Sequence, residues 1–194
     1  MISISAGTVV LELVDEAGAT IGQAEKLAAH TAPGQLHRAF SVFLFDRTGR
    51  MLVQRRSLTK YHSPGVWSNS CCGHPFLGEL PYEAAARRVS EELGVTPRDL
   101  KGAGTTQYHC TDPDSGLIER EYNHLFVGMV DPPLNIDPTE VVEFRFFTPP
   151  ELREWRVEHT FSVWFSTVLA AALPGIRRAV GNAQHWEPET VGHA

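Results

Sequence analysis

The residues best suited to chemistry gather in one stretch, 71–95, where a loop leads into a predicted helix. The loop carries a thiol and an imidazole, at Cys72 and His74, and the helix places Arg88 one turn before Glu92. As a solvated ion pair, Arg88 and Glu92 would contribute about 0.2–0.5 kcal/mol to stability. As parts of a site, the carboxylate would hold a divalent cation and the guanidinium would bind a phosphate oxygen. The spacing alone leaves both interpretations open.

Two histidines nearer the amino terminus stand on either side of a forced turn. His30 and His37 are separated by Pro33 and Gly34, a pair that favours a change of chain direction. If the segment folds back there, the two imidazoles come together. A metal ion between them and two ordinary histidines are both compatible with this pattern.

Two carboxylates further along the chain lie on one predicted strand. Because side chains alternate along a strand, Glu119 and Glu121 point to the same side of the sheet. On an outer face they would be ordinary solvated charges. On an inner face, two close carboxylates need a cation, or one of them must hold a proton.

Basic and aromatic side chains offer two further partners. Arg56 and Lys60 follow a predicted strand, where such residues are either solvated or bind an anion. Trp164 lies in an apolar segment, and an aromatic residue in that setting is usually part of the core.

These residues need a framework of strands and helices to bring them together. Alternating and β-branched runs predict strands, turn residues separate them, and the helical period of the apolar residues marks helices. The expected order is a hairpin (8–14 and 20–26), strands 38–45 and 50–55, an ordered loop (61–70), the helix before Thr96-Pro97, strands 105–110, 117–130 and 141–147, and helices 149–156 and 161–173.

Length and composition limit the classes of protein. A chain of 194 residues with 42% hydrophobic residues is long enough for one domain. The net charge of −6 argues against nucleic acid or an anionic membrane as the main partner. The lack of a long apolar run or a secretory pattern predicts a cytoplasmic protein. Three cysteines do not make a disulfide framework, so free thiols are expected, with Cys71 and Cys110 as small buried residues.

The stretch 73–95 resembles the Nudix box, a loop–helix–loop that binds metal-diphosphate substrates. The matching residues are Gly73, Glu79, Arg87, Val89, Glu91, Glu92, Gly94 and Val95. One position departs from the hydrolase form of the motif, because Arg88 stands where a glutamate is expected. The departure exchanges a metal ligand for a cation and weakens the case for a nucleotide-diphosphate hydrolase.

With Arg88 included, the chain is similar to one branch of that superfamily, the type I isopentenyl-diphosphate isomerases. The most specific match is residues 64–75, and the residues after Glu121 are less typical, with Tyr122-Asn123-His124 there. The last twenty residues match nothing in the pattern. The resemblance also covers Glu25-Lys26, residues 29–31, 36–41 and 55–56, Lys60, Tyr108, Glu119, Glu121, Phe161-Ser162 and Trp164.

This resemblance implies a role for each candidate residue. One divalent cation (Mn²⁺, Zn²⁺ or Mg²⁺) would be held by His30, His37, His74, Glu119 and Glu121. A second, Mg²⁺, would bridge Glu92 and the substrate diphosphate. Lys26, Arg56, Lys60 and Arg88 would bind the diphosphate oxygens. Cys72 and Glu121 would move the protons beside Tyr108, while Trp164, with Trp67 in the same wall, would face a carbocation.

The implied fold is α/β (α+β): a Nudix fold with a mixed central β-sheet between helices and an N-terminal hairpin. Residues 1–194 would form a single Nudix-type domain with a flexible tail at about 181–194. The implied activity interconverts isopentenyl diphosphate and dimethylallyl diphosphate by protonation and deprotonation of the double bond. The expected partner is this small-molecule prenyl diphosphate, with no nucleic acid and no membrane, and either a monomer or a homodimer is compatible.

Two rival functions remain at this point. A Nudix pyrophosphohydrolase of a nucleotide or prenyl diphosphate would need an activated water, which Arg88 and the pair Cys72 and His74 disfavour. A non-catalytic zinc-stabilised module would use Cys72, His74, His30 and His37 as structural ligands. The other histidines are expected to be ordinary, although His62, close to Lys60, is a possible substrate contact.

Overall fold

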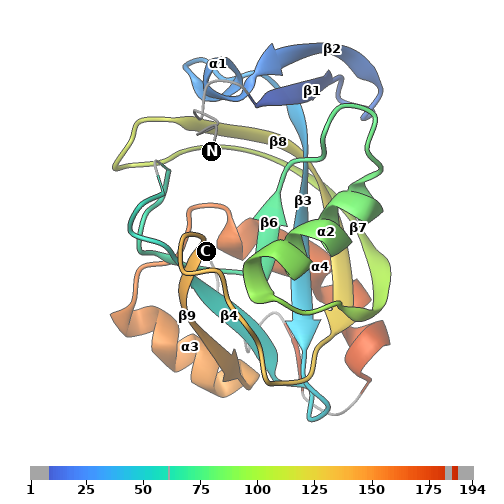
Figure 1. The fold of residues 1–194 in the computed structure, drawn as a ribbon, viewed down its shortest axis with the longest axis vertical. Helices are drawn as coiled ribbons and strands as arrows, with labels where there is room; N and C mark the ends of the chain where they lie inside the picture. The colour runs from blue at the N-terminus through green and yellow to red at the C-terminus, as the bar shows by residue number, and fades with distance from the viewer. Residues whose placement is uncertain (1–8, 61, 182–184, 188–194) are drawn as a thin grey trace.

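The computed structural model describes residues 9–60, 62–181 and 185–187. Within these residues, a mixed sheet lies between helices (Figure 1). The strands are β1 (Val10–Val14), β2 (Thr20–Glu25), β3 (His37–Phe45), β4 (Met51–Arg56), β5 (Trp67–Ser68), β6 (Cys71–Gly73), β7 (Arg98–Thr111), β8 (Ile118–Met129) and β9 (Val141–Phe147). The helices are α1 (Lys26–His30), α2 (Pro81–Leu93), α3 (Pro149–Glu158) and α4 (Phe165–Val180). The predicted fold class is confirmed.

Strand β3 is the centre of the sheet and is covered on both faces. Its side chains alternate between two cores, with Phe43 and Phe45 in the core under α4 and Val42 and Leu44 in the core under α2. Figure 1 shows α2 crossing in front of β3 while α4 lies behind the sheet. A strand buried on both faces needs a continuous apolar run, which is the pattern that β3 has.

Strand pairing brings the candidate residues to one end of the sheet. β8 runs parallel to β3 and places Glu121 opposite His37. β7 is antiparallel to β8 and places Tyr108 opposite Glu121. β6 is antiparallel to β3 and places Cys72 opposite Ser41. Residues far apart in the sequence therefore become neighbours through three separate pairings.

Helix α2 carries the charged residues of the motif on one face and packs its other face into the core. Ala85, Val89 and Leu93 are fully buried in the core beneath it. The helix ends at Gly94, whose φ of 63° lies in the left-handed region that favours glycine. A side chain there would also collide with the Asn135 carbonyl, since a Cβ would lie 2.3 Å from that oxygen. The helix predicted from the motif is confirmed.

The last helix differs from the sequence prediction. It was expected at 161–173 but spans Phe165–Val180, with Pro174 and Gly175 inside it. Gly175 does not end the helix. Its lack of a side chain lets α4 approach β7 closely. A Cβ at this position would lie 2.4 Å from the Cβ of Ala103. The predicted loop at 61–70 also contains strand β5.

The expected flexible tail contains an anchored residue. Trp186 is 1% exposed, and its ring meets Phe45 edge-on at 5.5 Å. Its indole N–H donates a hydrogen bond to the Gly49 carbonyl at 3.0 Å. Residues 182–184 and 188–194 of the predicted tail lie outside the described part of the chain. Among the helices described, none has the length and apolar character that a membrane crossing requires.

Candidate active site and metal centre

A pocket of about 310 Å³ opens between the sheet end, α2 and the loop before β5. It collects most of the residues that the sequence singled out. Those in its wall are Lys26, His30, Arg56, Lys60, Cys72, His74, Arg88, Tyr108, Glu119, Glu121 and Trp164. His37 and Glu92 lie just behind this wall, where both are buried.

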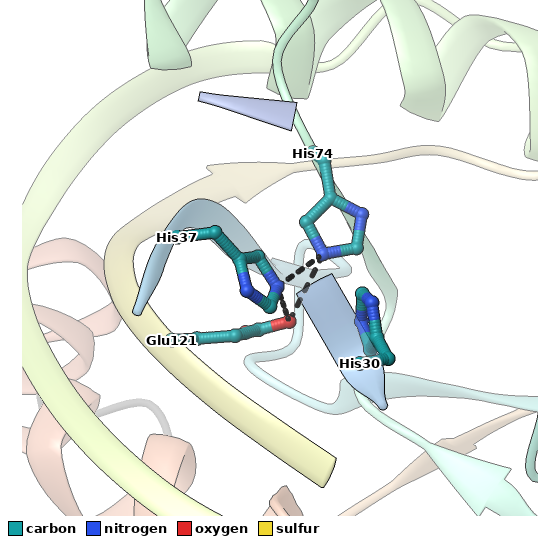
Figure 2. A group of neighbouring side chains, drawn as sticks. All are labelled: His30, His37, His74 and Glu121. Atoms are coloured by element: carbon teal, nitrogen blue, oxygen red, sulfur yellow. Dashed lines mark hydrogen bonds and ion pairs between the residues drawn. The ribbon is translucent and has the colours of Figure 1, made fainter. Parts of the chain in front are cut away.

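Four side chains converge at the wall of this pocket and form a candidate metal site, the His–Glu group. His30, His37, His74 and Glu121 each offer one ligand atom, and these atoms lie within 4.8 Å of one another. Figure 2 shows them pointing toward one another from separate segments of the chain. The Nε2 atom of His74 lies 3.2 Å from both His37 Nε2 and Glu121 Oε1. Cys72 is not part of this group, which argues against the structural zinc module.

Two of the imidazoles are oriented by the backbone. The Nδ1 atom of His30 is hydrogen-bonded to the Lys26 carbonyl at 2.7 Å, and that of His37 to the Gln35 carbonyl at 2.8 Å. Each bond leaves Nε2 facing the other members of the group. Carbonyl contacts of this kind fix the tautomer and the ring orientation of metal-binding histidines.

Burial favours the neutral, metal-binding form of two of these histidines. Burial, together with the nearby His30, lowers the pKa of His37 to about 4. Burial and the charge of Lys26 hold the pKa of His74 well below its ordinary value. Both rings are therefore neutral near pH 7, and a neutral imidazole is the form that binds a metal.

The two carboxylates form a buried pair with opposite pKa shifts. Burial and the charge of Glu119 raise the pKa of Glu121 well above its ordinary value. Burial would also raise the pKa of Glu119, but the adjacent imidazoles of His30 and His62 hold it well below. Glu119 Oε2 is buried, accepts no hydrogen bond and lies 3.5 Å from His30 Nε2. This orphaned oxygen fits a cation beside the four-residue group.

The remaining oxygen of Glu121 receives two hydrogen bonds. The hydroxyl of Tyr108 donates to Glu121 Oε2, and the amide of Asn123 donates to the same atom at 2.8 Å. One side of the carboxylate thus faces the histidines and the other is fixed by donors. The sequence marked Asn123 only as part of a less typical stretch and gave it no role, because an amide on a strand carries no motif.

Cys72 faces the pocket, whereas its neighbour Cys71 does not. Side chains alternate along β6, so Cys71 packs into the core under α2 and Cys72 contacts the core that contains Trp164. Burial raises the pKa of Cys72 to about 12. The group is therefore a thiol that holds its proton at neutral pH.

A cluster of charges lies at the other end of the pocket. Arg88 forms ion pairs with Glu92, Glu91 and Glu140, at 2.5, 2.8 and 3.2 Å. Lys60 also pairs with Glu140. Glu92 is 4% exposed and also accepts from the Gln54 amide, so the Arg88–Glu92 pair is not a solvated surface pair. Glu140 was missed in the sequence, because it lies far from the motif.

Two further cations complete this end. Burial lowers the pKa of Lys26, with the charge of Glu119 opposing the shift. Arg56 donates to the carbonyls of His62 and Ser63, and its guanidinium carbon lies 5.6 Å from the centroid of the Trp164 ring. The basic residues at the strand exit are thus built into the pocket.

Trp67 is a predicted site residue that packs away from the pocket. It is 3% exposed and packs edge-on against Trp155 at 5.5 Å. β5 pairs with β4, and this pairing turns the indole into the aromatic cluster beside α3. His62 shows the opposite case, because a histidine expected to be ordinary is buried in the pocket wall.

Comparisons with known proteins agree with this arrangement. A family model for the NUDIX domain matches residues 35–167. The isopentenyl-diphosphate Delta-isomerase of Streptomyces coelicolor is 60% identical over 94% of this chain and 92% of its own length. A protein of the same name from Nocardia farcinica is 41% identical, over 88% of this chain and 98% of its own.

Solved structures share the fold at low identity. DR0079 from Deinococcus radiodurans superposes with a TM-score of 0.65 at 20% identity, covering 87% of this chain and 98% of its own. A MutT protein from Methanosarcina mazei has a TM-score of 0.55 at 20% identity, covering 75% of this chain and 96% of its own. These likenesses support the arrangement of strands and helices alone.

Proposed function

Because this chain belongs to the isopentenyl-diphosphate Delta-isomerases of the NUDIX family, we propose that its pocket carries the proton transfers of that reaction. The enzyme interconverts isopentenyl diphosphate and dimethylallyl diphosphate. The observation that carries the assignment of the site is one juxtaposition. A buried His–Glu group, the Cys72 thiol and the Tyr108–Glu121 pair share a pocket whose other end is lined by cations.

The reaction needs two groups that exchange protons with carbon. One proton is added to the terminal carbon of the double bond and another is removed two carbons away. Cys72 and Glu121 are the groups proposed to do this, with the Tyr108 hydroxyl holding one oxygen of Glu121. The half-buried thiol of Cys72 and the buried carboxyl of Glu121 can each hold a proton inside the pocket.

The His–Glu group is proposed to hold a divalent cation, Mn²⁺, Zn²⁺ or Mg²⁺. Its ligands would be His30, His37, His74, Glu119 and Glu121, a nitrogen and oxygen set that suits these ions. When bound, the cation would supply positive charge that offsets the repulsion between the two neighbouring carboxylates. The backbone-held imidazoles give the ligand atoms their direction before any ion arrives.

The opposite end of the pocket is proposed to bind the diphosphate. Lys26, Arg56, Lys60 and Arg88 would contact its oxygens, and Glu92 would help to hold a Mg²⁺ ion that bridges to it. Glu140 forms ion pairs with both Lys60 and Arg88. The arriving diphosphate would therefore compete with this carboxylate for the same two cations.

Trp164 is proposed to stabilise the positive charge that develops on carbon. Its indole is 4% exposed and lines the pocket. An aromatic face near a cation contributes about 0.5–2 kcal/mol, more where water is excluded. Water exclusion also protects the intermediate, because water would trap a carbocation as an alcohol.

The packing of the hairpin and of the last helix supports a single domain, residues 1–194. The NUDIX match covers 35–167, but β1 pairs with β3 and α4 packs on β7 and β8. The hairpin therefore extends the sheet of the matched region, and the last helix shares its core. We propose one Nudix-type domain that acts on a small-molecule prenyl diphosphate, as a monomer or a homodimer.

The proposal is tested with isopentenyl diphosphate and Mg²⁺ in deuterated water. We expect dimethylallyl diphosphate to form and deuterium to enter both isomers, as read by NMR. No exchange from folded, metal-loaded protein would contradict the proposal. Phosphate release from a nucleotide or prenyl diphosphate without isomerisation would instead support a pyrophosphohydrolase.

Replacing Arg88 with alanine is expected to raise KM for isopentenyl diphosphate about 10- to 100-fold, because one charge-assisted contact is lost. The rate at saturating substrate should change much less, since Arg88 lies away from the His–Glu group. Arg98→Ala is the matched control, because Arg98 pairs with Asp131 on the surface. Steady-state kinetics of both variants measure the effect, and an unchanged KM in Arg88→Ala would remove this residue from the diphosphate site.

A further inference from the structure

His62 lies in the pocket wall between two carboxylates. Its Nδ1 atom is 2.9 Å from Glu119 Oε1, and its Nε2 atom is 3.4 Å from Asp112 Oδ2. The side chain is buried, and its ring centroid is 6.1 Å from that of His30. Carboxylate oxygens only accept hydrogen bonds, so Nδ1 must carry the hydrogen in the contact with Glu119. His62 is thus a donor to the carboxylate beside the metal group.

Asp112 is a fixed carboxylate on the other side of this imidazole, with its Oδ2 atom at ion-pair distance from Nε2. It is 2% exposed and accepts hydrogen bonds from the backbone N–H groups of Asp114 and Ser115, at 3.0 and 2.8 Å. The Ser115 hydroxyl donates to Oδ1, and the Ser63 hydroxyl donates to Oδ2. Burial would raise the pKa of Asp112, but these donors lower it, so the group is a carboxylate. Its position is set by the turn between β7 and β8.

Arg56, a residue of the proposed diphosphate site, fixes the backbone at His62. Arg56 donates to the His62 carbonyl at 2.9 Å and to the Ser63 carbonyl at 3.0 Å. Ser63 has a φ of 46°, in the left-handed region, which turns the chain sharply after His62. The imidazole is therefore attached to a restrained segment of backbone.

The contact with His62 gives the two Glu119 oxygens different surroundings. Oε1 faces His62, and Oε2 faces His30 with no hydrogen-bond partner. A carboxylate that is held at one oxygen can rotate little, so the other oxygen keeps its direction. The same ring stacks on Trp164, at 5.6 Å between centroids and 28° between planes. His62 thus contacts both the carboxylate and the indole that the reaction would use.

We propose that His62, next to Asp112, is a positioning residue. It directs Glu119 Oε2 toward His30 and the rest of the His–Glu group, and it packs against the indole of Trp164. This inference rests on the proposed function. It adds a residue that was expected to be ordinary, and it gives that residue a defined task. His62 prepares the metal site and does not itself touch the reacting carbon atoms.

Three substitutions at one position separate donation from packing. Asparagine carries an N–H donor where Nδ1 of histidine stands, glutamine carries one nearer the place of Nε2, and alanine carries none. We expect His62→Ala and His62→Gln to bind Mn²⁺ about 10- to 100-fold more weakly than the wild type, with a similar loss of kcat at limiting metal. His62→Asn should stay within about threefold of the wild type, because it keeps the donor to Glu119.

The test begins from chelator-stripped protein titrated with Mn²⁺, followed by kinetics with isopentenyl diphosphate. KM for the substrate should remain within about twofold in each variant, because no diphosphate contact is removed. His109→Ala is the matched control, since His109 is an exposed histidine on β7. Asp112→Asn should weaken Mn²⁺ binding in the same direction but less, and it extends the test if His62→Ala does not fold.

Three results would overturn the proposal. These are wild-type Mn²⁺ affinity in His62→Ala, equal losses in His62→Asn and His62→Ala, and a raised KM with unchanged kcat. The last would make His62 a substrate contact. A wild-type protein that binds Mn²⁺ but shows no isomerisation would instead refute the proposed function, and the metal titration would still decide the role of His62.

Discussion

Cys72→Ala is expected to lower the isomerisation rate on the order of 10³-fold, within the range for loss of a positioned acid or base. The thiol lies in the pocket and holds its proton at neutral pH, since burial raises its pKa to about 12. Alanine has no proton to exchange, and its smaller side chain leaves the backbone pairing of β6 with β3 intact. Isomer formation followed by NMR, at saturating substrate and metal, measures the loss.

The fold and the metal should survive this change. Cys72 is outside the four-residue ligand group, so Cys72→Ala should bind Mn²⁺ and unfold at a temperature close to that of the wild type. Cys71→Ala is the matched control, because the adjacent thiol faces the core under α2 and should keep its activity. Joint loss of metal and fold in Cys72→Ala would favour a structural zinc module.

Local patterns were enough to predict α2 and most of the strands that carry the site, but neither α1 nor β6 was predicted. The apolar stripe of α2 and the paired charges at Arg88 and Glu92 both depend on a helical period, which a single segment reveals. The family resemblance then distinguished a site from a surface ion pair. That distinction agrees with the buried position of Glu92, at 4% exposure.

The convergence of the histidines could be anticipated only in part. The turn at Pro33-Gly34 suggested that His30 and His37 meet, and their rings lie 4.6 Å apart. The distance from His37 to Glu121 depends on the parallel pairing of β3 with β8, which joins segments far apart in the chain. Spacing along the sequence carries no information on such a pairing.

His62 and Trp67 show where sequence patterns fail. The burial of His62 depends on Asp112, in a turn fifty residues later, and on Trp164, at the start of α4. Trp67 was assigned to the pocket by its place in the motif, but one step along β5 decides which face it occupies. Both outcomes are set by tertiary packing.

The second large effect is expected for Glu121→Gln, on the order of 10³-fold in rate. Glutamine preserves the size of the side chain and an oxygen that can accept from Tyr108 and Asn123. It removes the negative charge that faces His37 and His74 and the capacity to hold a proton. Isomer formation measured with saturating Mn²⁺ separates the loss of proton transfer from weaker metal binding.

The control for this charge removal is Glu143→Gln, because Glu143 is a strand carboxylate paired with Arg145 away from the pocket. A rate within tenfold of the wild type for metal-saturated Glu121→Gln would exclude Glu121 as a proton-transfer group.

The double variant Cys72→Ala, Glu121→Gln gives a sharper criterion. If both groups serve one turnover, either single change already stops it, so the double variant should be about as slow as the slower single variant. A loss equal to the product of the two single losses would mean that the residues act independently. Cys72 and Glu121 would then not be the two proton-transfer groups of one reaction.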